Sequence, residues 1–180
     1  LLSDLTISDE NWRVISLRYF NPVGAHVRGN IGENPVGTPN NLFPIICNVA
    51  SGKTSKLEVF GNTWPTRDGT CLRDYIHVMD LAEAHKASIE LLHEMKDNFL
   101  VLNIGNGIGI SVLEAIHTFE EINKCKIPYS FSEKRNGDIP ILVADNKRAL
   151  SLLNWKPIRD INEMCRDAWN WQKKNPNGYK

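Results

Sequence analysis

Two arginines in polar, glycine-bearing stretches are the first candidates for ligand chemistry. Arg73 lies within Asp68–Tyr75, and Arg135 lies within Glu133–Asp138. A guanidinium presents a planar fork of donors that suits the oxygens of a diphosphate. The ordinary alternative is a surface arginine beside a neighbouring carboxylate, as Arg73 with Asp74. From residue types alone this alternative is favoured, because surface ion pairs are common and weak.

Asn21 is a third candidate, since it follows an apolar run that ends at Phe20. Ligands of open α/β folds bind at the carboxyl ends of parallel strands. Asparagine before Pro22 is also ordinary turn chemistry. The two interpretations are equally supported.

The glycine run Gly105–Ile110 sits between a predicted strand and a predicted helix, where a dinucleotide-binding loop would lie. Its third glycine comes one residue early, and Ile110 stands where the last glycine of the motif belongs. A structural turn is therefore the favoured interpretation over phosphate binding.

The composition excludes several classes of protein. Lys+Arg and Asp+Glu are both 21, so the formal charge is zero and no nucleic-acid partner is indicated. No window of about eighteen apolar residues predicts a membrane span. The histidines have no metal-ligand spacing, and the cysteines form no CxxC pair, so no metal site is expected. Four scattered thiols fit burial in a reducing cytoplasm: Cys47, Cys71, Cys125 and Cys165.

Strands and helices alternate along the chain, which predicts an α/β fold with at least partly parallel pairing. Strands are expected at 14–20, 57–60, 72–76, 99–104 and 127–132, with Asn21-Pro22 ending the first and 99–104 buried on both faces. Helices are expected after residues able to cap them: Asn40 or Asn41, Asp80, Ser111 with Glu114, Asp145, and Asp160 with Glu163. A long loop at 24–41 precedes the first of these helices.

Read together, several blocks resemble the substrate region of UDP-glucose 4-epimerases, in the extended short-chain dehydrogenase family. The resemblance runs in order from residue 12 onward. Its blocks are Leu17–His26, Ile31–Glu33, Pro39–Leu42, Asp68–Thr70, Arg73–Val78, Asp80–Ala82 with His85, Arg135 with Gly137-Asp138, Leu153–Pro157, Trp169–Gln172 and Asn175–Tyr179.

The resemblance implies the last part of an NAD-binding Rossmann domain plus a smaller mixed α/β substrate-binding domain. Residues 1–26 would be the terminal piece of the Rossmann domain, and 27–180 the UDP-sugar-binding domain. Segment 72–104 would contribute a helix and a strand back to the Rossmann sheet.

The resemblance also implies roles for individual residues. Arg73 and Arg135 would bind the diphosphate, and Asn21 would contact the diphosphate and sugar. A substrate-lining segment would be Asn40, Asn41 and Leu42. The uracil would be flanked by Glu58, Val59 and Phe60, and the ribose by Asn136, Gly137 and Asp138. Tyr19 and Phe20 would lie near the nicotinamide of NAD, and Leu142, four residues after Asp138, would set the width of the sugar pocket.

The family's catalytic base is a tyrosine followed four residues later by a lysine, whose charge lowers the tyrosine pKa. No Tyr-x-x-x-Lys occurs in these 180 residues. No catalytic residue is therefore assigned in this chain. We expect a C-terminal fragment, inactive alone, of an enzyme that interconverts UDP-glucose and UDP-galactose through a 4-keto intermediate and bound NAD.

Two alternatives remain open: an inactive UDP-sugar-binding module, and a fragment of a related nucleotide-sugar dehydratase or decarboxylase. The blocks Asn21–His26 and Asn40–Leu42 argue against the second. The resemblance further implies a cytoplasmic homodimer of galactose metabolism, with neither nucleic acid nor membrane as a partner.

Overall fold

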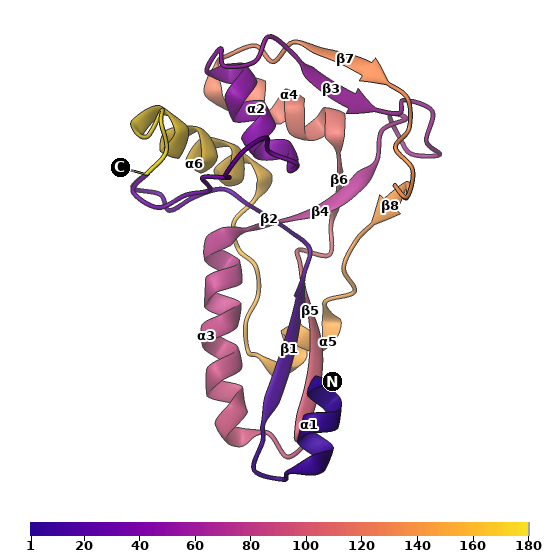
Figure 1. The fold of residues 1–180 in the computed structure, drawn as a ribbon, viewed down its shortest axis with the longest axis vertical. Helices are drawn as coiled ribbons and strands as arrows, with labels where there is room; N and C mark the ends of the chain where they lie inside the picture. The colour runs from indigo at the N-terminus through magenta and orange to yellow at the C-terminus, as the bar shows by residue number, and fades with distance from the viewer. Residues whose placement is uncertain (180) are drawn as a thin grey trace.

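The chain folds into two packed regions that share one central sheet (Figure 1). The structure is a computed structural model that describes residues 1–179. The lower region contains α1 (Leu2–Ser8), β1 (Val14–Tyr19), α3 (Val78–Glu94), β5 (Phe99–Ile104) and α5 (Lys147–Leu152). The upper region contains α2 (Leu42–Ala50), β3 (Leu57–Phe60), α4 (Val112–Asn123), β7 (Tyr129–Ser132) and α6 (Ile161–Lys174). Between them lie β2 (Asn21–Val23), β4 (Leu72–His77), β6 (Gly109–Ser111) and β8 (Ile141–Leu142).

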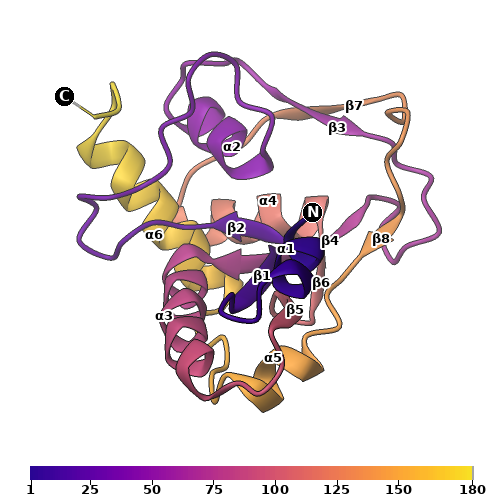
Figure 2. The same ribbon diagram turned by 60° about the horizontal axis from the view of Figure 1, so that its bottom comes forward.

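In the lower region, β1 and β5 form a parallel pair in which Val14 lies opposite Phe99. Long helix α3 lies alongside them, as both views show (Figures 1 and 2). The core of this region consists of Ile76, Leu81, Ala84, Leu102, Ile104, Ala149, Leu153 and Trp155. The expected α/β architecture is therefore confirmed, with parallel strands and a covering helix.

The burial of β5 differs from the expectation of a strand covered on both faces. Leu100, Leu102 and Ile104 are buried, whereas the alternating residues Phe99, Val101 and Asn103 are only half-buried. The continuous apolar run hides this difference, because side chains on alternate positions of a strand point to opposite faces.

The central sheet is mixed. β4 pairs in parallel with β2, where Asn21 lies opposite Tyr75, and antiparallel with β6. It also pairs in parallel with β8, where Arg73 lies opposite Leu142. The prediction that the first strand ends at Asn21-Pro22 is confirmed, since β1 ends at Tyr19, but these two residues themselves belong to another strand. After Phe20 the chain leaves the β1–β5 pair and continues as β2 in the central sheet, because Pro22 is compatible with an edge strand.

The upper region packs three helices around a second core. α4 and α6 contact each other, and α2 contacts α6 and β3. Phe43, Ile46, Ile116, Phe119 and Met164 are almost fully buried there. β3 and β7 form a separate parallel pair, Phe60 opposite Ser132, so β7 begins two residues later than predicted.

Helix starts were predicted from capping residues, with mixed outcomes. The capping boxes of Ser111 with Glu114 and of Asp160 with Glu163 are confirmed. Asp80 does not cap α3; His77 does, three residues earlier, and its side chain accepts from the Met79 amide. Similarly, α5 begins after Asn146 and not after Asp145, although the Asp145 carboxylate accepts from the Lys147 amide.

No helix in residues 1–179 is both long and apolar enough to cross a membrane.

Candidate functional site

A cavity of about 210 Å³ lies where the central sheet meets the upper region. Eleven residues singled out from the sequence line it: Phe20, Asn21, Asn40, Asn41, Leu42, Glu58, Val59, Phe60, Arg73, Arg135 and Asp138. They come from five separate stretches of the chain. Such convergence of polar and apolar groups in one concave place is typical of a ligand site.

Four of these stretches reach the cavity on or beside a regular element, and the fifth, Arg135 with Asp138, lies in the loop between β7 and β8. Phe20 and Asn21 lie at the step from β1 to β2, and Arg73 lies on β4. Glu58 to Phe60 form the end of β3, and Leu42 begins α2. Strand pairing and helix packing thus fix the positions of the first four stretches, but not those of Arg135 and Asp138.

The two arginines share one carboxylate. Arg73 Nη2 lies 3.4 Å from Asp138 Oδ1, and Arg135 Nε lies 3.0 Å from Asp138 Oδ2. Arg73 Nη1 also donates to the carbonyl oxygens of Leu72 and Ile139, both at 2.9 Å. The Arg135 guanidinium lies over the Phe60 ring, 4.6 Å from its centroid. Each guanidinium has more donors than this one shared carboxylate can accept, so both arginines retain donors for an anionic ligand, although Glu58 also lines the cavity.

The ordinary alternative for Arg73, a surface ion pair with Asp74, is wrong. Successive residues of a strand point to opposite faces, and Asp74 is completely buried on the other side. Its carboxylate accepts from the amides of Asn106 and Gly107, both at 2.8 Å, and of Ala144 at 3.1 Å.

These contacts also explain the glycine run Gly105–Ile110. A Cβ on Gly105 would lie 2.7 Å from Asp74 Oδ2, and Gly107 has a positive φ of 73°. The amides of the turn bind an internal carboxylate in place of a phosphate. Burial raises the pKa of Asp74, although these three amide bonds oppose that shift. The prediction of a structural turn is confirmed.

Helix α2 begins at the cavity with no capping side chain. Asn41 occupies the N-cap position, but its side chain donates to Glu33 Oε1 at 3.2 Å. No acidic residue lies in the first turn. The positive end of this helix therefore faces the cavity with no carboxylate in its own first turn, which favours a negatively charged ligand, although Glu33 lies beside the N-cap side chain.

Four predicted site residues do not line the cavity. Tyr19 is 53% exposed and its ring lies against His85, because it points to the opposite side of β1 from Phe20. Asn136 and Gly137 form the tip of the turn whose Asp138 amide bonds to the Arg135 carbonyl. Leu142 lies opposite Arg73 in the pairing of β8 with β4 and is 42% exposed.

The sequence interpretation missed seven lining residues: Pro22, Val23, Ile45, Leu57, Cys71, Tyr75 and Val112. For two of them a signal existed. Cys71 and Tyr75 lie two positions on either side of Arg73, so strand periodicity places all three on one face. The others are apolar positions that any core would contain.

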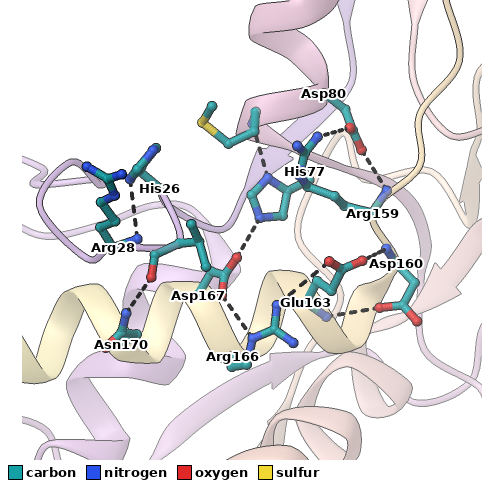
Figure 3. A network of polar contacts seen from close by, with 12 residues as sticks. His26, Arg28, His77, Asp80, Arg159, Asp160, Glu163, Arg166, Asp167 and Asn170 are labelled. Carbon is teal, nitrogen blue, oxygen red and sulfur yellow. Dashed lines mark hydrogen bonds and ion pairs between the residues drawn. The ribbon is translucent and has the colours of Figure 1, made fainter.

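A second polar cluster, which does not include Arg73 or Arg135, joins the start of α3 to α6 (Figure 3). His77 Nδ1 accepts from the Met79 amide, so Nε2 carries the proton and donates to Asp167 Oδ2 at 3.3 Å. Asp167 also accepts from Arg166 Nε at 3.0 Å. Burial lowers the pKa of His77, and the nearby Asp167 carboxylate only partly offsets this. The imidazole is therefore neutral.

Asp80, in the first turn of α3, is also completely buried. It accepts from the Arg159 guanidinium and from the amides of Ile158 and Arg159, the latter at 2.9 Å. Trp155 Nε1 donates to the Asp80 carbonyl at 3.0 Å. These bonds fasten the segment before α6 onto α3.

No cluster of three or more potential metal ligands occurs among the described residues. The cysteines are free thiols. Burial raises the pKa of Cys47 to about 12 and raises that of Cys165 as well. These two thiols are packing groups, because only the thiolate is a good nucleophile.

Comparison with known proteins gives a consistent result. The family model described as GDP-mannose 4,6 dehydratase matches residues 8–168. The UDP-glucose 4-epimerase of Drosophila melanogaster is 48% identical over 99% of the chain, and that of Bacillus subtilis is 49% identical over all of it. The chain spans about half the length of these relatives, 51% and 53% respectively.

Solved structures agree with these relatives. A UDP-glucose 4-epimerase from Stenotrophomonas maltophila, with bound NAD and formylated UDP-arabinopyranose, superposes with a TM-score of 0.94 at 44% identity. The enzyme from Bifidobacterium longum, in complex with NAD+ and UDP, gives a TM-score of 0.92 at 45% identity. The matches cover 97% and 98% of this chain and 52% of each solved chain.

Proposed function

We propose that this chain, which belongs to the GDP-mannose 4,6 dehydratase family, forms the substrate-binding part of a UDP-glucose 4-epimerase. The observation that carries the proposal is the cavity in which Arg73 and Arg135 converge beside the uncapped start of α2. Relatives named for this activity at 48% and 49% identity support it.

The arginines would hold the diphosphate. A diphosphate has oxygens enough for both guanidinium forks, and charge-assisted bonds of this kind are about twice as strong as neutral ones. Asn21, Asn40 and Asn41 supply neutral amides nearby. Firm binding of the diphosphate and weak binding of the hexose would let a 4-keto sugar turn over within the site.

Asp138 and the end of β3 would hold the nucleoside. Glu58, Val59 and Phe60 line the cavity beside Arg135, so a flat base has a backbone edge and an aromatic ring to contact. Among the described residues, the Asp138 carboxylate accepts hydrogen bonds only from the side chains of the two arginines. It could therefore rotate away from them and accept hydrogen bonds from ribose hydroxyls. Asn136 and Gly137, at the tip of the same turn, would close over the ribose.

NAD would act as the acceptor and donor of the hydride. The residues of this chain fit only a small part of it: Phe20 at the cavity, with Tyr19 beside it at the end of β1. The glycine turn between β5 and β6 is not available for NAD, because its amides already bind Asp74. We propose that residues outside this chain make most contacts with NAD and supply the Tyr-x-x-x-Lys base.

The alternative function is that of a nucleotide-sugar dehydratase or decarboxylase. It is compatible with the same family, whose model is described as GDP-mannose 4,6 dehydratase. The alternative of an inactive binding module shares the same cavity. The coding sequence just upstream of Leu1 separates this module from the enzyme: an open frame with Tyr-x-x-x-Lys supports an epimerase, and a start codon there supports the module.

The domain boundaries, the cellular compartment and the oligomeric state follow from the same proposal. Residues 1–26, together with α3 and β5 from segment 72–104, would belong to an NAD-binding Rossmann domain, and the rest of 27–180 to the UDP-sugar-binding domain. The whole protein would be a cytoplasmic homodimeric isomerase of galactose metabolism. Four free thiols support a reducing compartment.

Calorimetric titration with UDP and UDP-glucose tests the site. We expect binding by the protein encoded by the whole reading frame that contains these 180 residues. Arg73→Ala and Arg135→Ala should each weaken UDP binding roughly tenfold to a hundredfold, about 1.5 to 3 kcal/mol for a bond between charged groups. Lys173→Met, a remote change of one positive charge, is the control. UDP affinity that is unchanged in both arginine variants rules out the site.

Leu142 tests the specificity assignment. We expect Leu142→Tyr to lower turnover of UDP-N-acetylglucosamine relative to UDP-glucose, since an aromatic ring would narrow the sugar pocket. The readout is the ratio of the two kcat/KM values. An unchanged ratio removes Leu142 from the pocket and agrees with its absence from the residues that line the cavity.

A further inference from the structure

The loops that follow β3 and β7 begin at the same end of this parallel strand pair (Figure 1). Phe60 and Ser132, the last residues of the two strands, lie opposite each other. The Gly61 amide donates to the Ser132 carbonyl at 2.9 Å, so the two loops begin in contact. One loop, 61–71, leads to β4, and the other, 133–140, carries Arg135 and Asp138.

Two further contacts join these loops beyond the strand ends. The Lys134 ammonium lies over the Trp64 ring, 4.2 Å from its centroid, and donates to the Thr63 carbonyl at 3.2 Å. Trp64 itself is held by its backbone amide, which donates to the Gly69 carbonyl at 2.9 Å. A cation over an indole face is the strongest of the common cation–π pairs.

Gly61 makes this approach feasible. A Cβ at residue 61 would lie 2.6 Å from Trp64 Nε1 and 2.7 Å from Lys134 Cγ. The backbone there also has a φ of 77°, which side chains other than that of glycine rarely adopt. Both the indole and the lysine stem therefore pack directly on the backbone that ends β3.

Lys134 precedes Arg135, so the two neighbours extend from one loop onto two aromatic rings. Lys134 covers Trp64, and Arg135 covers Phe60 at 4.6 Å. Arg135 is 54% exposed, and its only ionic partner in the described chain is Asp138 from the same loop. The Phe60 ring is the only contact by which Arg135 itself holds loop 133–140 against β3 in the described chain.

We propose that Lys134 and Trp64 form a latch that positions Arg135 at the cavity. Both are positioning residues: they contact the loops and would act on the ligand only through Arg135. The inference rests on the proposed function for the identity of the ligand, a nucleoside diphosphate. Its effect should be larger on the diphosphate than on the nucleoside, because the base contacts proposed for β3 do not depend on loop 133–140 and only the ribose contacts proposed for Asn136, Gly137 and Asp138 do.

Paired titrations with UDP and uridine test the latch in the protein encoded by the whole reading frame. We expect Lys134→Met and Trp64→Leu each to weaken UDP binding roughly fivefold and to leave uridine binding within about twofold, as expected for a partly exposed cation–π pair. Lys134→Arg and Trp64→Phe, which keep a cation and a ring face, should restore most of the UDP affinity.

Lys173→Met is the matched control, because Lys173 lies over Trp169 at 5.9 Å on α6, outside the cavity. It should leave both affinities unchanged. In an Arg135→Ala background, Lys134→Met should have an effect of less than about twofold, since coupled residues are not additive. Equal weakening of UDP and uridine, or full additivity with Arg135→Ala, overturns the proposal.

A ligand-free measurement separates failure of the latch from failure of the proposed function. Tryptic cleavage after Arg135, followed by mass spectrometry, should be roughly fivefold faster in Trp64→Leu than in the wild-type protein. Faster cleavage in a protein that does not bind UDP retains the latch and refutes the proposed function. An unchanged cleavage rate refutes the latch, whatever the protein binds.

Discussion

The cavity and the start of α3 contain the same kinds of charged residue in different surroundings. At the cavity, Asp138 accepts hydrogen bonds only from the side chains of Arg73 and Arg135 within the described chain. At the start of α3, Asp80 accepts from two backbone amides as well as from Arg159. A carboxylate held by side chains can exchange them for a ligand by a change of rotamer. One held by backbone amides cannot do so without local unfolding.

Burial follows the same division. The side chain of Asp138 is 18% exposed and that of Arg135 is 54% exposed, whereas the side chain of Asp80 is completely buried. Asp74 is buried in the same way and bound by three amides. Residue type therefore does not distinguish a binding carboxylate from a structural one. The distinction lies in whether side chains or backbone amides donate to its oxygens.

Asp80→Ala should have the largest effect on stability. It leaves Arg159 and two backbone amides without an acceptor, and breaking a buried pair costs about 3 to 5 kcal/mol. Urea denaturation measures the loss. Glu83→Ala is the matched control, because Glu83 contacts the same arginine at 3.2 Å but is 47% exposed. We expect less than about 1 kcal/mol from it, and equal losses in the two variants would contradict the comparison.

Acid should act on the buried cluster through His77. Its pKa is lowered in the folded protein, so the unfolded chain binds a proton first as the pH falls through its ordinary value of 6.5. Stability is therefore complete above that pH and is lost as the pH falls toward the lowered pKa of the folded state, by up to about 1.4 kcal/mol per pH unit for one proton.

Urea denaturation from pH 7.5 to 5 measures this dependence. Asp167, Asp80 and Arg159 are the charged groups nearest to His77. His77→Asn keeps an acceptor for the Met79 amide and removes the titration. The pH slope should become smaller in this variant, whereas a slope equal to that of the wild type would assign the effect to another histidine.

Asp160→Ala separates burial from the number of hydrogen bonds. The Asp160 side chain accepts from the Glu163 amide at 3.0 Å and from Asn162, as a buried carboxylate would, yet residue 160 is exposed. We expect a loss of about 1 kcal/mol in urea denaturation, the usual effect of removing a helix cap. A loss as large as that of Asp80→Ala would show that exposure makes no difference.

Asp138→Asn should have the smallest effect on stability, within about 0.5 kcal/mol, as is usual for surface substitutions. It should bind inorganic pyrophosphate roughly fivefold more tightly, because the two arginines lose the carboxylate that competes for them. Calorimetry with pyrophosphate gives the affinity. Weaker pyrophosphate binding in this variant would mean that Asp138 orients the arginines for the ligand.

Sequence patterns predicted most of the elements, because strand runs and capping boxes are local signals. They located the start of α3 at Asp80 in place of His77, since a buried carboxylate with distant partners has the same sequence signature as a cap. The resemblance supplied eleven lining residues, whereas the partner of Arg73 could not be predicted. Asp138 is 65 residues away, and only the pairing of β4 with β8 brings their segments together.

The central position of β4 has a consequence for the order of events as the chain is made. Its three neighbours are residues 21–23, 109–111 and 141–142, so they lie both before and after it in the sequence. During synthesis, β4 can pair only with β2 until residues 109–111 have left the ribosome, and its pairing with β8 must wait for residues 141–142. Pairings so distant in sequence form slowly. The arginine site would thus be assembled among the last parts of the molecule, after α3 and α4 have had time to form.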